Sequence, residues 1–286
     1  MSRRTNLVIG CAAVLLVLSC TTIRLPKMSK IVTGPTQTKQ IEVPMPDGGD
    51  VQHVEIAMGA GQLEIQPGAE TFLVDGEIRY NVEELAPEVT TSNGKTSIRQ
   101  GKVEGIPDLE GTIENQWDLR LGHSPMALTL NVGAAAADVE LGGLALARVT
   151  VTQGASDFSL AFSEANSAEM EALGITAGAS RMVVSGLGNA NAAEIAFKGG
   201  AGSYTFRFDG ELRQDVKVSI DAGLGQVVVI VPAGVPATVT FEGAVANVEA
   251  VHDWARTDEG FAVAGTGFGI TFKIKLGVGG LELRNK

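Results

Sequence analysis

The chain has 286 residues, of which 44% are hydrophobic and 19% are charged, and its formal net charge is −11. This hydrophobic content supports a buried core and excludes an intrinsically disordered chain, which combines low hydrophobicity with high charge. The acidic balance argues against a nucleic-acid-binding protein, because phosphates require clusters of Lys and Arg. Two cysteines are too few for a zinc cluster or a disulfide framework.

Residues 1–19 have the layout of an export signal. Arg3 and Arg4 precede an apolar run from Leu7 to Leu18, which is too short to anchor stably across a bilayer. The segment Val17-Leu18-Ser19-Cys20 resembles the lipobox of bacterial lipoproteins. This resemblance implies that residues 1–19 are removed and that Cys20 carries the lipid anchor. The alternative is an ordinary secretory signal whose cleavage site falls near a cysteine.

Residues 20–47 have the composition of a flexible tether, with little apolar periodicity. Its basic residues would lie beside the membrane, where anionic headgroups attract them. From residue 48 onward, 16 basic residues stand against 31 acidic ones. We therefore expect the body of the protein to be repelled by the membrane surface that its tether approaches.

The rest of the chain is predicted to be β-structure built from a repeat of roughly 22 residues. Glycine accounts for 36 of the 286 residues, well above the usual share of about 7%. Apolar pairs at alternate positions flank the repeated glycines, which is typical of strands with one buried face. The repeats centre on Gly133, Gly154, Gly178, Gly200 and Gly223, with outlying copies at Gly59, Gly277 and, more weakly, Ala244.

One repeat is too small to bury its own apolar face, so we expect successive repeats to stack in parallel about 4.8 Å apart. The predicted fold is all-β, a β-helix-like parallel β-solenoid with a single-stranded ladder, in which each glycine bends the chain with a positive φ. The copy at Gly133 needs a two-residue alanine insertion, after which Val139 and Leu141 fill the core positions. The alternative is an antiparallel sandwich, which also uses short alternating strands.

The glycine turns resemble those of the toast-rack family of bacterial envelope lipoproteins, which is similar to the C-terminal part of cell-wall-active antibiotic response proteins. The resemblance covers roughly residues 50–286, and Ala135, Ser156 and Ser180 depart from the family's third turn glycine. It implies a β-solenoid with no known enzymatic activity, with an N-terminal β portion at residues 48–125 and solenoid repeats at residues 126–286. It rests, besides the repeated Gly-Ala turns, on Gly59-Ala60-Gly61, Trp117-Asp118-Leu119-Arg120-Leu121 and Gly186-Leu187-Gly188-Asn189-Ala190.

The spacing between Ala244 and Gly277 is irregular, and its excess falls in a loop at residues 251–260. Long loops on a regular scaffold often carry function, and Trp254 with Arg256 is a composition that interfaces prefer. We favour the alternative of a cap, in which Trp254 covers the end of the solenoid core.

Motifs for catalysis, cofactors and metals are absent from the sequence. His53, His123 and His252 share no metal-ligand spacing, and the Gly-x-Gly segments precede strands rather than the helix of a dinucleotide site. We therefore expect no catalytic residue, no cofactor and no metal site.

One row of side chains, three positions after each turn, is predicted to lie on an exposed edge. In a stack its members become neighbours, and they could form a carbohydrate or cation site. We favour a solvated face with one Asp157–Arg181 ion pair, worth about 0–1 kcal/mol. The row consists of Asp138, Asp157, Arg181, Ser203 and Gln226.

Together these patterns predict a lipid-anchored protein on the outer face of a bacterial envelope membrane, acting as a non-catalytic structural, binding or sensing module. Its expected partners are the membrane, through the lipid, and an envelope protein or cell-wall glycan. One alternative is a carbohydrate-active β-helix enzyme, which would need acids in a groove lined by aromatic residues. The other is a surface adhesin that self-associates through an open solenoid end, because unpaired strand edges favour pairing.

Overall fold

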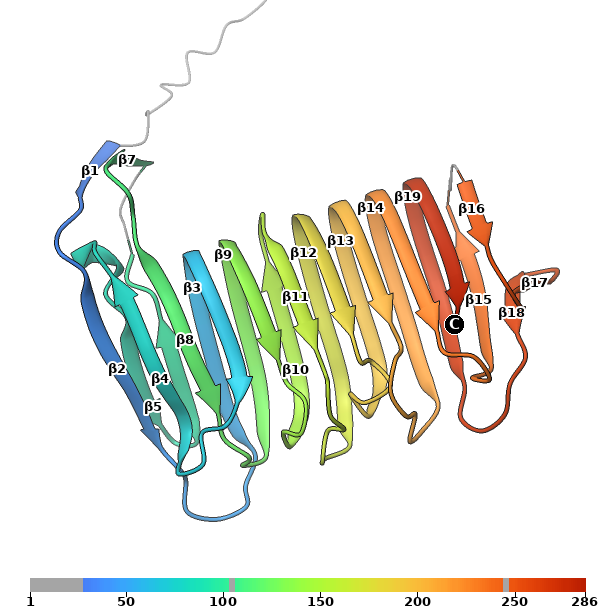
Figure 1. Ribbon diagram of the computed structural model, residues 1–286, viewed down its shortest axis with the longest axis horizontal. Helices are drawn as coiled ribbons and strands as arrows, with labels where there is room; N and C mark the ends of the chain where they lie inside the picture. Colours follow the sequence, from blue (N-terminus) through green and yellow to red (C-terminus); the bar gives the residue numbers. More distant parts are fainter. Residues whose placement is uncertain (1–27, 103–105, 244–246) are drawn as a thin grey trace, which may run out of the picture.

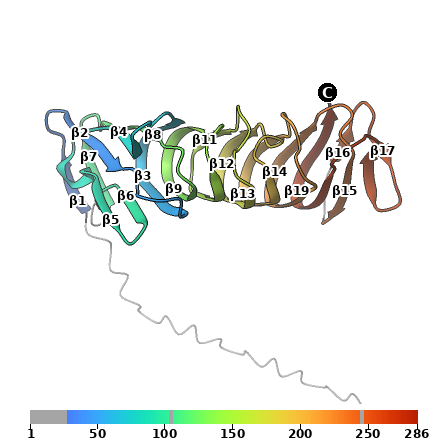
Figure 2. The same cartoon turned by 90° about the horizontal axis from the view of Figure 1, so that it is seen from below.

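The computed structural model describes residues 28–102, 106–243 and 247–286. Within these ranges the chain is all-β, with one short 3-10 turn, η1 (Glu83–Leu85). The strands lie side by side in one long row (Figure 1), and the view from below shows a narrow, elongated body (Figure 2). The all-β prediction is confirmed.

Each unit of the row, called a rung here, is a long strand that bends once near its middle. One rung is split at its bend into β10 (Leu146–Gln153) and β11 (Asp157–Ala161). The unbroken rungs are β3 (Gln52–Pro67), β9 (Met126–Glu140), β12 (Met170–Ser185), β13 (Ala192–Arg207), β14 (Val216–Val231) and β19 (Ile270–Asn285).

Neighbouring rungs pair in parallel and in register. Leu173 on β12 lies beside Ile195 on β13, which in turn lies beside Val218 on β14. The split rung pairs in parallel with β9 on one side and β12 on the other. The predicted parallel stacking of the repeats is therefore confirmed, and the antiparallel sandwich is wrong for them.

Both halves of a rung face one core because the alternation of buried residues shifts at the bend. In β14 the buried positions are even-numbered from Val216 to Ala222 and include odd-numbered Val227, Val229 and Val231 after the bend. The halves before the bend form one sheet, called the leading sheet, and the halves after it form the trailing sheet. A single hydrophobic cluster fills the space between them from Ile41 to Leu283.

The repeated glycines sit at the bends, but the predicted positive φ is wrong. None of the described bend glycines has a positive φ. At three rungs the residue with a positive φ is instead the glycine two positions after the bend glycine, namely Gly61, Gly225 and Gly279. The bend glycine is required instead by close packing between rungs. A Cβ added to Gly178 would lie 2.7 Å from the carbonyl oxygen of Gly154 on the preceding rung, closer than side-chain carbons ever approach.

The order of the last rungs differs from the predicted order. The chain-terminal strand β19 pairs with β14, from Val216 beside Ile270 to Val231 beside Asn285. The rung predicted around Ala244, a residue outside the described ranges, is represented by β15 (Ala237–Glu242) and β16 (Asn247–Ala250), which lie on the far side of β19. The physical reason is length, because β19 matches β14 along almost its entire length, whereas β15 and β16 are short.

The C-terminal end of the leading sheet is closed by antiparallel strands. β18 (Gly260–Val263) pairs with β15, and β17 (Ala255–Arg256) pairs with β18. The loop predicted at residues 251–260 thus runs into this closing hairpin.

The N-terminal end is also closed by antiparallel pairing. β4 (Phe72–Tyr80) lies between β2 (Gln37–Pro44) and β8 (Asn115–Leu121). β5 (Glu88–Ser92) and β6 (Lys95–Arg99) form a hairpin around Asn93-Gly94, which both have the positive φ that a two-residue hairpin loop requires. Beside them, β1 (Met28–Val32) pairs with β7 (Ile106–Glu110).

The N-terminal strands and the repeats share one stack. β6 and β8 pair in parallel with the first and second halves of β3, as a rung would, and β3 pairs with β9. The hydrophobic core is therefore continuous across residue 125. The boundary between the portions at 48–125 and 126–286 stays a prediction. The flexible tether predicted at residues 20–47 is wrong from Gln37 onward, because β2 pairs with β4 and buries Ile41 and Val43 in the core.

Candidate functional site

The predicted lipid anchor, Cys20, lies outside the described residues, as does the whole of the predicted signal at residues 1–19. Anchoring therefore stays a prediction. In the part of the chain that the structure describes, no helix is long and apolar enough to cross a membrane.

The predicted row three positions after the turn forms only in part. Asp157, Arg181, Ser203 and Gln226 lie side by side on consecutive rungs, all of them exposed or half-exposed. The predicted Asp157–Arg181 ion pair is not within ion-pair distance, although the two residues are register partners.

Asp138 does not belong to this row, and the alanine insertion proposed at Gly133 is wrong. Ala136 is the register partner of Asp157, and Asp138 lies two places further on, beside Ser159. The reason is that Ala137, buried to 6% exposure, occupies the core position that Phe158 fills on the next rung. Because alanine is small enough for a buried or an exposed position, the sequence pattern did not show which alanine faces the core, and the predicted register was wrong by two residues.

Asp138 instead ends a row of four carboxylates across the trailing sheet, called the acidic row here. Glu77 on β4 is the register partner of Asp118 on β8, Asp118 lies beside Glu64 on β3, and Glu64 lies beside Asp138. Like charges directly opposite each other on a sheet are destabilising. Among the described residues, the ion pair found in this row is that of Glu77 with Arg79, at 3.7 Å.

A groove of about 580 Å³ follows the acidic row and extends to Asp157 and Arg181. Its aromatic lining residues, Trp117 and Phe158, are buried at 1% and 3% exposure, so they offer no flat surface for a sugar ring. Sequence reasoning missed this row because strands distant in the chain bring its members together.

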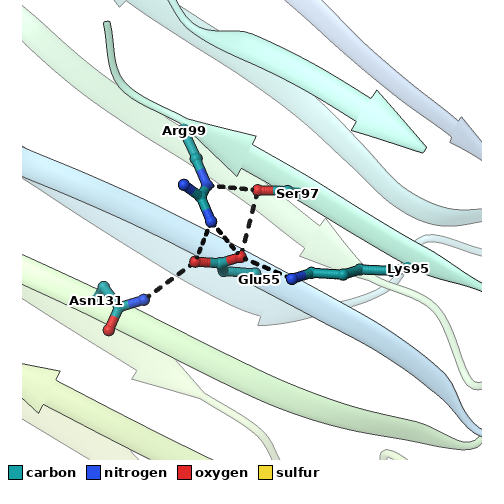
Figure 3. Close-up of polar contacts among 5 residues, drawn as sticks. All are labelled: Glu55, Lys95, Ser97, Arg99 and Asn131. Atoms are coloured by element: carbon teal, nitrogen blue, oxygen red, sulfur yellow. Dashed lines mark hydrogen bonds and ion pairs between the residues drawn. The ribbon is translucent and has the colours of Figure 1, made fainter. Parts of the chain in front are cut away.

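A second polar cluster lies on the outer face of the leading sheet around Glu55 of β3 (Figure 3). Arg99 donates from Nη2 to both carboxylate oxygens at 2.8 and 2.7 Å, and Lys95 Nζ lies 3.6 Å from Oε2. Asn131 Nδ2 and Ser97 Oγ donate to the same carboxylate at 3.4 and 3.5 Å. The hydrogen bond from Arg99, with its charge and that of Lys95, outweighs desolvation and holds the pKa of Glu55 below its usual value.

A third polar network closes the first glycine bend. Gln100 Oε1 accepts hydrogen bonds from the backbone nitrogens of Gly59 and Ala60 at 2.9 and 3.3 Å and from Asn115 Nδ2 at 2.8 Å. Asn115 Oδ1 in turn accepts from the indole of Trp117 at 2.9 Å. Gly59 begins the glycine ladder, so Gln100 takes the place that a preceding rung occupies elsewhere.

This network lines a second groove, called the bend groove here. Its volume is about 1470 Å³. The groove is lined by the bends of β3, β9 and the split rung and by Leu85, Gln100, Lys102 and Ile113.

Trp254 is buried at 7% exposure within the main core, as the cap interpretation predicts. Its Nε1 is the buried side-chain nitrogen or oxygen for which the described chain provides no hydrogen-bond partner. Arg256 lies outside the core, with its guanidinium carbon 5.9 Å from the ring centre of Phe261.

The described residues contain no group of three or more His, Cys, Asp or Glu side chains placed to hold a metal ion. The acidic row and the Glu55 cluster lie on sheet faces, and the Gln100 network lies at a bend.

Comparisons with known proteins identify the fold. The family described as the N-terminal domain of toast_rack (DUF2154) matches residues 32–185. No curated protein matches the chain in sequence. A structure from Clostridium sporogenes ATCC 15579, described as a "putative cell adhesion protein", is 17% identical with a TM-score of 0.50, covering 88% of this chain and all of its own.

A structure from Parabacteroides merdae ATCC 43184, described as a "putative adhesin", is 12% identical with a TM-score of 0.39. It covers 90% of this chain and 98% of its own. At 17% identity the likeness to the Clostridium sporogenes structure concerns the fold alone.

Proposed function

Because the chain belongs to the toast-rack family, we propose that it is a lipid-anchored envelope protein that acts as a non-catalytic binding module. Export and anchoring are supported by the signal and the lipobox-like segment ending at Cys20. The body then projects from the membrane as a rigid rod, since parallel rungs with one continuous core resist bending.

The acidic row is the observation that carries the binding role. Glu64, Asp118 and Asp138 stand next to each other on open strands at a cost in stability, in an arrangement that a cationic partner would relieve. We propose that the trailing sheet binds an envelope partner that presents a positively charged surface. Such binding is steered by charge and weakens as salt screens it.

The test compares two double variants with the same change in charge. Glu64→Gln with Asp138→Asn removes two carboxylates from the acidic row, whereas Glu194→Gln with Asp221→Asn removes two from the outer face of the leading sheet. Partners cross-linked to the anchored protein in its native envelope are quantified by mass spectrometry at low and high salt. A partner lost in the first variant and at high salt, but retained in the second, supports the proposal. Equal capture by both variants contradicts it.

A surface adhesin is the second candidate. It is favoured by the fold shared with the Clostridium sporogenes structure described as a "putative cell adhesion protein". Beads coated with the purified chain should then attach to surfaces or to each other, and a failure to attach above the level of uncoated beads would exclude this role.

A further inference from the structure

The bend groove differs from the acidic face in its chemistry. The part of its lining called the floor here consists of small residues at the first glycine bends, including Ala57, Gly59, Ala60 and Gly133, and the apolar side chains of Leu85 and Ile113 also line the groove. A groove with an apolar lining and a few fixed polar groups is the usual form of a small-molecule site.

Gln100 supplies the fixed polar group. Three donors converge on its Oε1, from Gly59, Ala60 and Asn115, and this determines which way the amide lies. Its Nε2 group donates no hydrogen bond within the described chain, and Gln100 lines the groove. Two amide hydrogens are thus held in place for an oxygen acceptor before any ligand arrives.

Lys102, which also lines the bend groove, supplies a positive charge. Its side chain is exposed, and no ion pair is found for it among the described residues. The neighbouring cation, Arg99, is already committed to Glu55 at 2.7 Å. The carboxylate of Glu114, which also lines the groove, accepts a hydrogen bond from Thr36 at 2.6 Å. Lys102 is therefore the cation that remains available to an anionic group beside Gln100.

We propose that the bend groove binds an amphiphile, with an acyl chain along the floor of the first glycine bends and an anionic, oxygen-bearing head at Gln100 and Lys102. The apolar floor accepts the chain because burying its methylene groups removes apolar surface from water. The head accepts hydrogen bonds from Gln100 Nε2 and pairs with Lys102.

The position of the groove makes membrane lipid a source of this ligand, a point that rests on the proposed lipid anchor. Met28 at the start of β1 pairs with Ile106, which follows Lys102 by four residues. The chain from Cys20 to Met28 spans at most about 29 Å. The groove thus lies at the end of the stack nearest the proposed anchor, where membrane lipid is within reach. The second source is a free fatty acid, whose binding would not depend on the anchor.

The experiment labels the full-length protein with photoactivatable palmitate, added as the free acid or as phosphatidylglycerol in vesicles, and maps the labelled peptides by mass spectrometry. The proposal predicts labels in residues 57–61, 99–102 and 112–116 in at least one arm, and the arm that labels them identifies the source. Labels confined to residues 1–27, or absent from the groove peptides in both arms, overturn it.

Matched variants separate the groove from non-specific contact. Ala60→Asp places a charge on the floor, and Ala201→Asp makes the same change at the equivalent exposed position of a distant rung. Lys102→Glu is paired in the same way with Lys217→Glu. We expect the groove variants to reduce labelling of the groove peptides at least five-fold and the control variants to leave it unchanged. Equal labelling in all four variants overturns the proposal, and it leaves the role of the acidic row unaffected.

Discussion

At the scale of single residues, the missing side chain of one glycine per rung sets how closely the rungs approach. The backbone of Gly178 packs against the carbonyl of Gly154, and Gly200 packs against Gly178 in the same way. The ladder pairing of the whole stack depends on this contact, because a bend held further from its neighbour would pull its two strands out of hydrogen-bonding distance.

Replacing a bend glycine should destabilise the protein even by one methyl group. Gly178→Ala places its Cβ 2.7 Å from a backbone carbonyl oxygen, and we expect a loss of about 1–3 kcal/mol in the free energy of unfolding. The control lies on the same strand: Gly174 has no atom within 4 Å of an added Cβ. Gly174→Ala should be neutral or should stabilise by up to about 1 kcal/mol. Urea unfolding measures both, and equal effects would mean that close packing is not the reason for the glycine.

Glu55 should make stability depend on pH. Its pKa is lowered in the folded state by Arg99 and Lys95, so its contribution is present above the unfolded-state pKa and is lost as the pH falls through the folded-state pKa. Lys95 and Arg99 are themselves about half exposed, so solvent screening limits the contribution to about 1 kcal/mol.

The test is Glu55→Gln against Glu194→Gln, an exposed glutamate of the same sheet. At pH 7 the first variant should be less stable than the wild type by about 1 kcal/mol, and the difference should shrink in acid as Glu55 takes up its proton. Glu194→Gln should show little effect at either pH. A difference for Glu55→Gln that stays constant from pH 7 to pH 3 would contradict the charge-pairing explanation.

At the scale of elements, the segment after β16 closes the core with one large side chain. Trp254 packs into the main hydrophobic cluster, but its indole nitrogen has no partner among the described residues. Burial of the ring stabilises the cap, while the unpaired donor opposes part of that gain.

Three substitutions separate these contributions by thermal melting. Trp254→Ala should cost about 3–5 kcal/mol. Trp254→Phe should cost less than half of that, because it keeps most of the ring and removes the unpaired donor. Arg256→Ala should be close to neutral, because this exposed side chain has little packing to lose. An unchanged melting temperature in Trp254→Ala would contradict the cap and return this loop to the binding alternative.

The insertion of β19 between β14 and the short strands β15 and β16 shows how pairing length can override chain order. A strand that follows its neighbour in sequence usually pairs with it. Here the chain-terminal strand matches β14 on both sides of the bend, with Gly277 stacked on Gly223. The short strands are left at the edge, where β17 and β18 complete the closure.

At the scale of the whole molecule, the protein is an elongated stack of paired strands (Figures 1 and 2). Its attachment is predicted to depend on one residue. Cys20→Ala should release the protein from the membrane fraction or block processing of residues 1–19, because acylation requires the thiol. Cys11→Ala, within the same apolar run, is the matched control and should leave attachment unchanged. Intact mass of the mature protein measures both, and a mature chain that starts at any residue other than an acylated Cys20 would contradict the anchor.

The sequence by itself determined the features that repeat locally. The apolar pairs around each glycine placed Leu173, Ile195 and Val218 in the core and set the spacing of the rungs, because an alternation of period two is written into neighbouring residues. The bends were likewise located at the right glycines, although for the wrong reason, since a positive φ and a close approach both call for glycine.

Only the tertiary structure decided which strands meet across long stretches of chain. The acidic row depends on β4, β8, β3 and β9 lying together, and the bend groove depends on Gln100 reaching back to Gly59 and Asn115 to Ala60. The register at Ala136 and the position of β19 depend on which strand pairing buries the most apolar surface and forms the most backbone hydrogen bonds. Local sequence patterns do not predict the outcome, because it depends on all the strands that could pair at the same position.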